Sequence, residues 1–319
     1  FTERGITAFD SSYLGVDEGG VTIRGGSSTN HGIYLEMGAD AWVHTTDISN
    51  VETGITLYGG SFLYLHDFAI NASIKGINFG KATVRQYGDG VGLIQGTSGA
   101  AVNVSRGIFE TSSEASFEIK NLKGGKVFDF WQSQGEVNNL KVNGFDITES
   151  GESAIEIGMG SSVSFRSIEI SGSCNDNFIG VKSGSVVDIR DSTIVATSTG
   201  RGIDVGGSSY LNFRNSTISG TAIDGNLVNI GSGSSANIRD STISGTVTND
   251  SLVSTSSGSY AQIRDSTVSG TVTGADMVNV GSGSSVNLRG STISGTASVD
   301  SMSLLYVRKG SSTGAVSCS

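Results

Sequence analysis

An arginine recurs about every 25 residues through the second half of this sequence, an interval that falls within the range typical of repeat architectures. Its six occurrences are Arg166, Arg190, Arg214, Arg239, Arg264 and Arg289. In a repeat architecture each unit buries its apolar face against its neighbours. A sandwich of antiparallel hairpins does not impose one constant period. The interval therefore favours a solenoid.

Each repeat contains three short stretches in which apolar and polar residues alternate. In one repeat the apolar positions are Val228 and Ile230, then Ala236 and Ile238, then Ile243 and Val247. Strict alternation predicts half-buried strands, and the clusters of Gly, Ser, Asn and Asp between them predict turns. We therefore predict an all-β chain, folded as a right-handed parallel β-helix (β-solenoid) with three strands per rung of about 20–25 residues.

The same repeat pattern continues toward the N terminus in a less regular form. Segments 38–48 and 60–70 align with residues 160–170, which places His44 and His66 in the arginine position, where their rings can stack. Earlier and later members of the same column are expected at Arg24, Arg85, Ser105 and Asn143. The column predicts about twelve rungs.

We expect one β-helix domain over residues 1–319. Its rungs are irregular over 1–143, regular over 144–300 and truncated over 301–319. Residues 304–307 resemble the strand at 227–230, so the sequence stops within a rung and leaves an exposed rung edge. With no initial methionine, the chain reads as a piece of a longer polypeptide.

Stacked rungs also bring identical side chains into columns. Serines are expected to stack at 216, 241, 266 and 291, and amides at Asn212, Asn237, Gln262 and Asn287. The aspartates that follow three of the arginines, Asp191, Asp240 and Asp265, partly neutralise the arginine column. A further column, Leu227, Leu252 and Met277, is either an outward apolar stripe or an inward corner.

Charge and composition exclude several classes of protein. The net charge is −10 and no basic run occurs, so nucleic acid is not an expected partner. No apolar run approaches the roughly 18 residues of a membrane helix, so we expect no membrane insertion of this segment. The two cysteines, Cys174 and Cys318, lie about six rungs apart and are predicted to be free thiols or to pair with another chain.

The regular spacing fails in one place, between Ser105 and Asn143, where the interval is well over the length of one rung. Irregular segments on a rigid scaffold often carry function, and aromatic faces with carboxylates suit sugar rings or protein contacts. The candidate ligand-binding residues are Tyr87, Asp89, Phe109, Glu110, Phe128, Asp129 and Trp131. The alternative is that the phenylalanines fill a locally wider core.

No catalytic residue is assigned and no cofactor is expected. Glu110, Glu114, Glu118 and Asp129 have the residue type of glycosidase carboxylates, but the sequence supplies no separation between them. If the chain is an enzyme, it is a polysaccharide hydrolase or lyase. No third ligand for His44 and His66 is evident, so we expect no metal site.

Residues 32–48 (GIYLEMGADAWVHTTDI), 154–170 (AIEIGMGSSVSFRSIEI) and the units at 240–245 and 265–270 resemble rungs of pertactin-like autotransporter passenger domains. The resemblance implies a right-handed β-helix and a secreted or surface-exposed bacterial adhesin. It implies no catalytic residue.

The function predicted from these features is that of a non-catalytic extracellular or cell-surface adhesin that binds a host cell-surface protein or glycan. The alternatives are a phage tail fibre or tailspike on the virion, which can degrade polysaccharide, and an ice-binding or structural filament protein that uses the stacked Thr-Ile-Ser hydroxyls. Two surfaces are open to self-association: the exposed rung edge and the column of Leu227, Leu252 and Met277.

Overall fold

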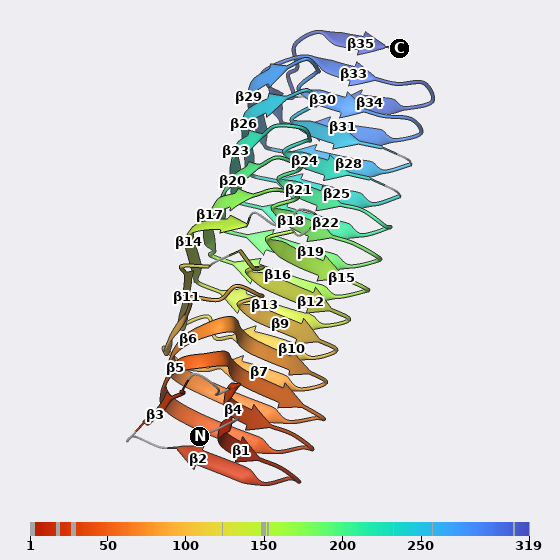
Figure 1. Ribbon diagram of the computed structural model, residues 1–319. Coiled ribbons are helices and arrows are strands. Elements are labelled where there is room, and N and C mark those ends of the chain that lie inside the picture. The colour runs from red at the N-terminus through yellow and green to blue at the C-terminus, as the bar shows by residue number, and fades with distance from the viewer. Residues whose placement is uncertain are drawn as a thin grey trace. The chain divides into compact units, whose positions relative to one another are not determined.

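The chain is an all-β parallel solenoid of about 11 turns, close to the expected twelve (Figure 1). It is seen in a computed structural model that describes residues 4–16, 20–26, 30–122, 124–147, 151, 153–231, 233–256, 258–308 and 310–318. These residues form 35 strands and no helix. No helix of membrane-spanning length and hydropathy therefore occurs among them. The contacts divide the chain into two compact units, Phe1–Ile147 and Thr148–Ser319.

Unit 1 is built from three faces of stacked parallel strands, and two long strands, β5 (Asp40–Tyr58) and β6 (Phe62–Gly80), pass through all three. Face 1 also holds β1 (Arg4–Ala8), β4 (His31–Leu35), β9 (Val102–Ser105) and β12 (Phe128–Trp131). Face 2 holds β2 (Tyr13–Val16), β7 (Thr83–Gln86), β10 (Ile108–Thr111) and β13 (Gln134–Asn138). Face 3 holds β3 (Val21–Arg24), β8 (Val91–Gln95), β11 (Ser116–Lys120) and β14 (Leu140–Ile147).

Unit 2 repeats a three-strand coil with parallel pairing throughout. Its face 1 stacks β15 (Ile155–Gly158), β18 (Ile179–Val181), β21 (Ile203–Val205), β24 (Val228–Ile230), β27 (Val253–Thr255), β30 (Val278–Val280), β33 (Ala297–Val299) and β35 (Val316–Cys318). Face 2 stacks β16 (Ser162–Arg166), β19 (Val186–Arg190), β22 (Tyr210–Arg214), β25 (Ser235–Arg239), β28 (Tyr260–Arg264), β31 (Ser285–Arg289) and β34 (Leu304–Val307). Face 3 stacks β17 (Glu169–Cys174), β20 (Thr193–Ser198), β23 (Thr217–Ala222), β26 (Thr242–Thr248), β29 (Thr267–Thr273) and β32 (Thr292–Ile293).

The alternating apolar residues of each coil form the core. Val228, Ala236, Ile238, Ile243 and Val247 are at most 1% exposed, which confirms the predicted strands and their inward faces. Each Val or Ile stacks on its counterpart in the next coil, as Ile238 does on Ile263. A single coil has no second layer to cover these side chains. The apolar surface is therefore buried only by stacking.

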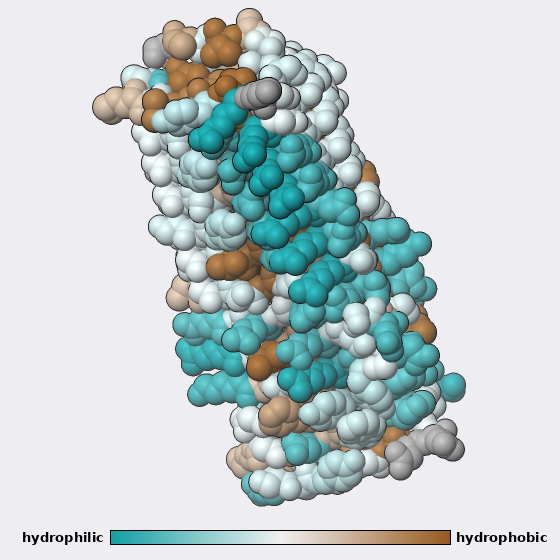
Figure 2. Space-filling model, turned by 180° about the vertical axis from the view of Figure 1, so that it is seen from behind, coloured by the Kyte–Doolittle hydropathy of each residue, from teal (hydrophilic) through white to brown (hydrophobic). Residues whose placement is uncertain are grey.

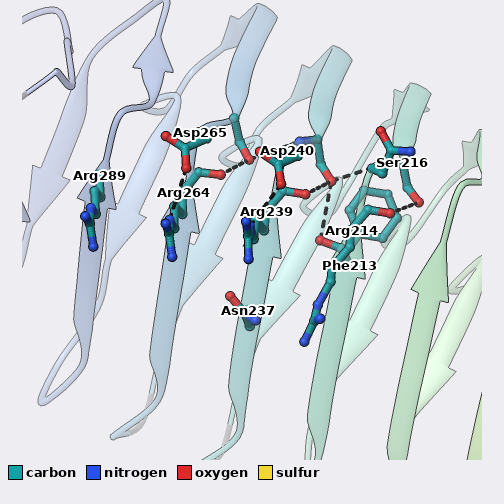
Figure 3. A network of polar contacts seen from close by, with 12 residues as sticks. Phe213, Arg214, Ser216, Asn237, Arg239, Asp240, Arg264, Asp265 and Arg289 are labelled. Carbon is teal, nitrogen blue, oxygen red and sulfur yellow. Dashed lines mark hydrogen bonds and ion pairs between the residues drawn. The ribbon is translucent and has the colours of Figure 1, made fainter.

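The arginine column is confirmed in unit 2, where Arg166 to Arg289 are paired in register from strand to strand. The residue after each arginine has a left-handed backbone, with φ of 53° at Asp191, 51° at Asp240 and 50° at Asp265. Asp, Asn and Gly tolerate this conformation best, which explains their use at this position. Asp240 and Asp265 also pair with the preceding arginines, at 2.9 and 3.0 Å (Figure 3).

The predicted serine column is also present, and it faces inward. The hydroxyl of Ser241 donates to the carbonyl of Arg239 at 2.6 Å and accepts the N–H of Ser216 at 3.3 Å. Ser266 and Ser291 continue the pattern in the next coils. The hydroxyls thus satisfy turn amides that no strand pairs with.

The arginine frame predicted for unit 1 is wrong at four positions. Arg24 and Asn143 lie on face 3, Ser105 lies on face 1, and Arg85 is paired with Tyr64 rather than with His66. Strands on all three faces end in the same apolar–polar pattern, so short matches do not identify the face. As a result, the overlong rung predicted between Ser105 and Asn143 does not exist. Ser105 is paired with Trp131, which lies one coil of ordinary length further along the chain.

Two further predictions concern apolar residues in unit 2. Leu227 and Leu252 are fully buried and Met277 is 5% exposed, so this column is an inward corner and is not a surface for self-association. Residues 304–307 form β34, which is paired with β31 on face 2, whereas the strand at 227–230 that they resemble lies on face 1. The final coil is shorter than the one before it, since Tyr260 is paired with Ser285 and Ser285 is paired with Leu304. The main reason is its face 3 strand, β32, which has two residues where β29 has seven.

Candidate functional site

Face 2 of unit 1 carries an outward row of large side chains that begins with Trp42. The strand register places Trp42 beside Tyr64, Tyr64 beside Arg85, and Arg85 beside Glu110. The rings of Trp42 and Tyr64 are stacked, with centroids 5.1 Å apart and planes 26° apart. Nε of Arg85 lies 2.6 Å from Oε2 of Glu110. The row therefore passes from aromatic to charged within four strands.

A second row, two residues further along each strand, consists of His44, His66 and Tyr87. The two imidazoles are stacked as predicted, with centroids 4.5 Å apart and planes 14° apart. Tyr87 lies 5.1 Å from His66 and 4.8 Å from Trp42, and its hydroxyl accepts the indole N–H of Trp42 at 2.7 Å. We call Trp42, His44, Tyr64, His66 and Tyr87 the aromatic platform.

The platform lies at the surface and is partly exposed. Trp42 is 38% exposed, and the neighbouring Phe62 and Tyr13 on the same face are 41% and 71% exposed. The side chains stand on strands whose opposite sides form the core, as Leu63 and Leu65 do at 1% and 0% exposure. Because the strands fix the backbone, the ring positions are set before any ligand arrives.

Carboxylates border the histidine end of the platform. Oδ1 of Asp89 lies 3.2 Å from Nε2 of His66, and Oδ2 of Asp67 lies 3.4 Å from its Nδ1. Asp67 also accepts the backbone N–H of Val91 at 2.8 Å, which fixes the position of its carboxylate. Asp67 lines an open hollow of about 300 Å³ on face 3, together with Thr45, Asp47, Phe68 and Leu93.

The structure separates the residues that the sequence grouped as a candidate site. Tyr87 belongs to the platform, and Asp89 and Glu110 border it. Phe109 and Phe128 are 1% and 0% exposed, and their rings pack against each other in the core at 6.0 Å. The alternative, that these phenylalanines fill the core, is what the structure shows for both.

The remaining two candidates lie on or next to face 1. Asp129 is paired in register with Asn103, and its carboxylate lies 3.4 Å from the ammonium of Lys126. Trp131 is 44% exposed at the end of β12. Their binding role stays a prediction, on a different face from the platform.

The sequence prediction missed Trp42 and Tyr64 and did not connect them with the histidines. One signal was present: Trp42 and His44 are two residues apart, as are Tyr64 and His66 in the next coil. Residues two apart on a strand share a face. Two consecutive coils thus present an aromatic ring and an imidazole on one side of the sheet. This pattern lies outside the irregular interval on which the sequence prediction was based.

A second exposed apolar area lies at the last coil of unit 2. Figure 2 shows hydrophobic side chains at the end where Figure 1 marks the C terminus. The exposed fractions there are 89% for Met302, 52% for Leu304, 46% for Val307 and 47% for Val316. Self-association through this rung edge stays a prediction.

Both cysteines are free thiols, as predicted. Cys174 is 3% exposed, and burial is the main cause that raises its pKa to about 11. Cys318 is exposed. A buried thiol with a high pKa is a poor nucleophile, so Cys174 has a packing role.

Comparison with known proteins shows no family for this chain. No protein-family profile and no curated protein matches the chain. One solved structure, described as "The cryo-EM structure of the Vag8-C1 inhibitor complex", contains a chain that is 14% identical to this one, with a TM-score of 0.41. The match covers 100% of this chain and 95% of the other. At this identity and score it carries no functional argument.

Proposed function

We propose that this chain is an extracellular or cell-surface bacterial binding protein that uses the aromatic platform of unit 1 to hold a host glycan, without catalysing a reaction. The observation that supports the proposal is the stacked, exposed Trp42 with Tyr64 and Tyr87 on a rigid sheet. Sugar rings present flat C–H faces that pack on indole and phenol rings, and well-ordered rings lose little entropy when they bind.

The groups around the platform match the polar edge of a sugar. The carboxylates of Asp89 and Glu110 and the guanidinium of Arg85 offer acceptors and donors to hydroxyl groups beside the aromatic faces. Tyr87 keeps its ring fixed through the hydrogen bond from Trp42. Aromatic contact would thus supply affinity, and the polar border would supply selectivity.

The regular coils of unit 2 support a mechanical role. Face 2 there presents the arginine column, and face 3 presents hydroxyls in register, such as Thr242 on Thr267 and Ser244 on Ser269. We therefore assign the repeats to scaffolding.

The two tryptophans of the chain offer a matched test. Trp42 and Trp131 are 38% and 44% exposed, but only Trp42 stands on the platform. On a glycan array and on host cells, Trp42→Ala should abolish binding, whereas Trp131→Ala should retain it. Loss with Trp131→Ala alone would locate the site on face 1 and refute the platform. Undiminished binding of the parent chain to deglycosylated cells would indicate a protein partner instead.

A further inference from the structure

The imidazoles of His44 and His66 meet the carboxylate of Asp67 at the edge of the platform. One nitrogen from each histidine and one oxygen of Asp67 lie within 4.8 Å of one another. The strand register brings the three together: His44 and His66 stack between adjacent coils, and Asp67 follows His66 directly. Two imidazoles and a carboxylate form a common ligand set of divalent transition metals. Asp67 thus stands where a third ligand is needed, a position not evident from the sequence.

The two nitrogens of His66 have different surroundings. Nε2 lies 3.2 Å from Oδ1 of Asp89, within reach of a hydrogen bond. Nδ1 is buried and has no hydrogen-bond partner among the described residues. A buried polar atom without a partner requires an explanation, and an ion is one of the standard ones.

This asymmetry has the form that metal-binding histidines show. Such a histidine commonly donates its second N–H to a carboxylate, which fixes the tautomer and leaves the other nitrogen's lone pair for the metal. Here Asp89 occupies the donor side, and the lone pair of Nδ1 is left on the side of Asp67. The 3.4 Å between Nδ1 and Oδ2 of Asp67 is about the separation of two ligands on one tetrahedral zinc ion, roughly 3.4 Å.

Small side-chain movements complete the arrangement. His44 is half-buried at the surface of the sheet, so its ring can rotate toward the other two ligands. Asp67 is held by the N–H of Val91 through Oδ1, which leaves Oδ2 directed at His66. Water or a ligand oxygen would fill the remaining position.

We propose that His44, His66 and Asp67 bind one divalent transition-metal ion of the Zn²⁺ or Ni²⁺ type, with Asp89 as the residue that orients His66. The imidazole nitrogens select such ions over Ca²⁺ and Mg²⁺, which require oxygen ligands. This site is independent of whether the platform binds a glycan, because it needs only these four side chains.

Isothermal titration of the full chain with ZnCl₂, and separately with NiCl₂, tests the proposal. The exposed thiol of Cys318 is also a zinc ligand, so the titrations use a Cys318→Ser background. We expect saturable binding of one ion per chain, and no binding of Mg²⁺. His44→Ala and His66→Ala should each weaken binding at least tenfold, and Asp89→Asn by about 10–100-fold.

The third histidine supplies the matched control. His31 is hydrogen-bonded to Thr56 on face 1, and His31→Gln should leave metal affinity unchanged. Circular dichroism verifies that each variant is folded. Absence of one-ion binding in the parent chain, or affinity that survives His66→Ala in a folded protein, overturns the proposal.

Fluorescence gives a second readout of position. The ring of Trp42 lies 4.8 Å from Tyr87, which lies 5.1 Å from His66, so Cu²⁺ at this site should quench Trp42. In a Trp131→Phe chain, which keeps Trp42, stoichiometric Cu²⁺ should quench emission strongly. Equal quenching in a Trp42→Phe chain would show that the ion binds elsewhere.

Discussion

Replacing Ser241 by alanine removes a hydroxyl that connects two neighbouring coils. The side chain is 5% exposed, donates to the carbonyl of Arg239 at 2.6 Å, also lies 3.3 Å from the carbonyl of Phe213, and accepts the N–H of Ser216 at 3.3 Å. The carbonyl of Arg239 keeps the N–H of Asn215 as a donor at 3.0 Å. The Ser216 amide has no other acceptor among the described residues. The substitution therefore leaves one buried donor unsatisfied.

The expected loss follows from that single group. A buried, unsatisfied N–H costs about 1–3 kcal/mol, and alanine adds no steric conflict. The free energy of unfolding of Ser241→Ala should fall by this amount, which lowers the melting temperature by about 2–4 °C for each kcal/mol in a unit of this size. Ser244, three residues further along in β26, is half-buried and faces outward, so Ser244→Ala should change stability by no more than about 0.5 kcal/mol.

Urea and thermal unfolding, followed by far-ultraviolet circular dichroism, compare the two variants with the parent chain. Hydrogen exchange of the peptide that contains Ser216 should accelerate in Ser241→Ala, because its amide loses its acceptor. Equal stability of the two serine variants, with unchanged exchange at Ser216, would refute the structural role given to the serine column.

Three further predictions concern the backbone conformation of Asp240 and the raised or lowered pKa values of Cys174 and His31. Asp240→Val should unfold about 1–2 kcal/mol more easily than Asp240→Gly in urea, because a β-branched residue is strained at φ 51°. Ellman's reagent at pH 8 should label one thiol per native chain, Cys318, and two per unfolded chain, since the pKa of Cys174 is raised to about 11. Burial, then the charge of Arg4, lowers the pKa of His31 below 6.5, so the unfolded state takes up this proton first. The free energy of unfolding should therefore fall as the pH drops below about 6.5, and His31→Gln should flatten that part of the urea-midpoint profile.

The regular coils were predictable because one sequence pattern repeats within them. The alternation at Ala236 and Ile238, and the interval from Arg239 to Arg264, are local and periodic, and the strand register reproduces both. The inward direction of a side chain at a corner between two faces could not be predicted in the same way. Leu227 interrupts the alternation, and only the turn of the chain before β24 directs it into the core.

The candidate site was less accessible to sequence reasoning. Ser105 and Asn143 lie on different faces, so their assignment to one column predicted an overlong rung that does not exist. Two of the predicted ligand-binding residues in that segment, Phe109 and Phe128, are core residues. Aromatic composition alone does not tell an inward ring from an outward one.

The sequence by itself determined the class of fold. Its period, its alternation and its turn residues require stacked strands, since a single coil cannot bury its own apolar face. Only the tertiary structure decided which side chains meet, because Trp42 and Tyr87 are 45 residues apart and come together through the register of successive coils. A shift of that register by one residue would point the side chains of the whole platform into the core.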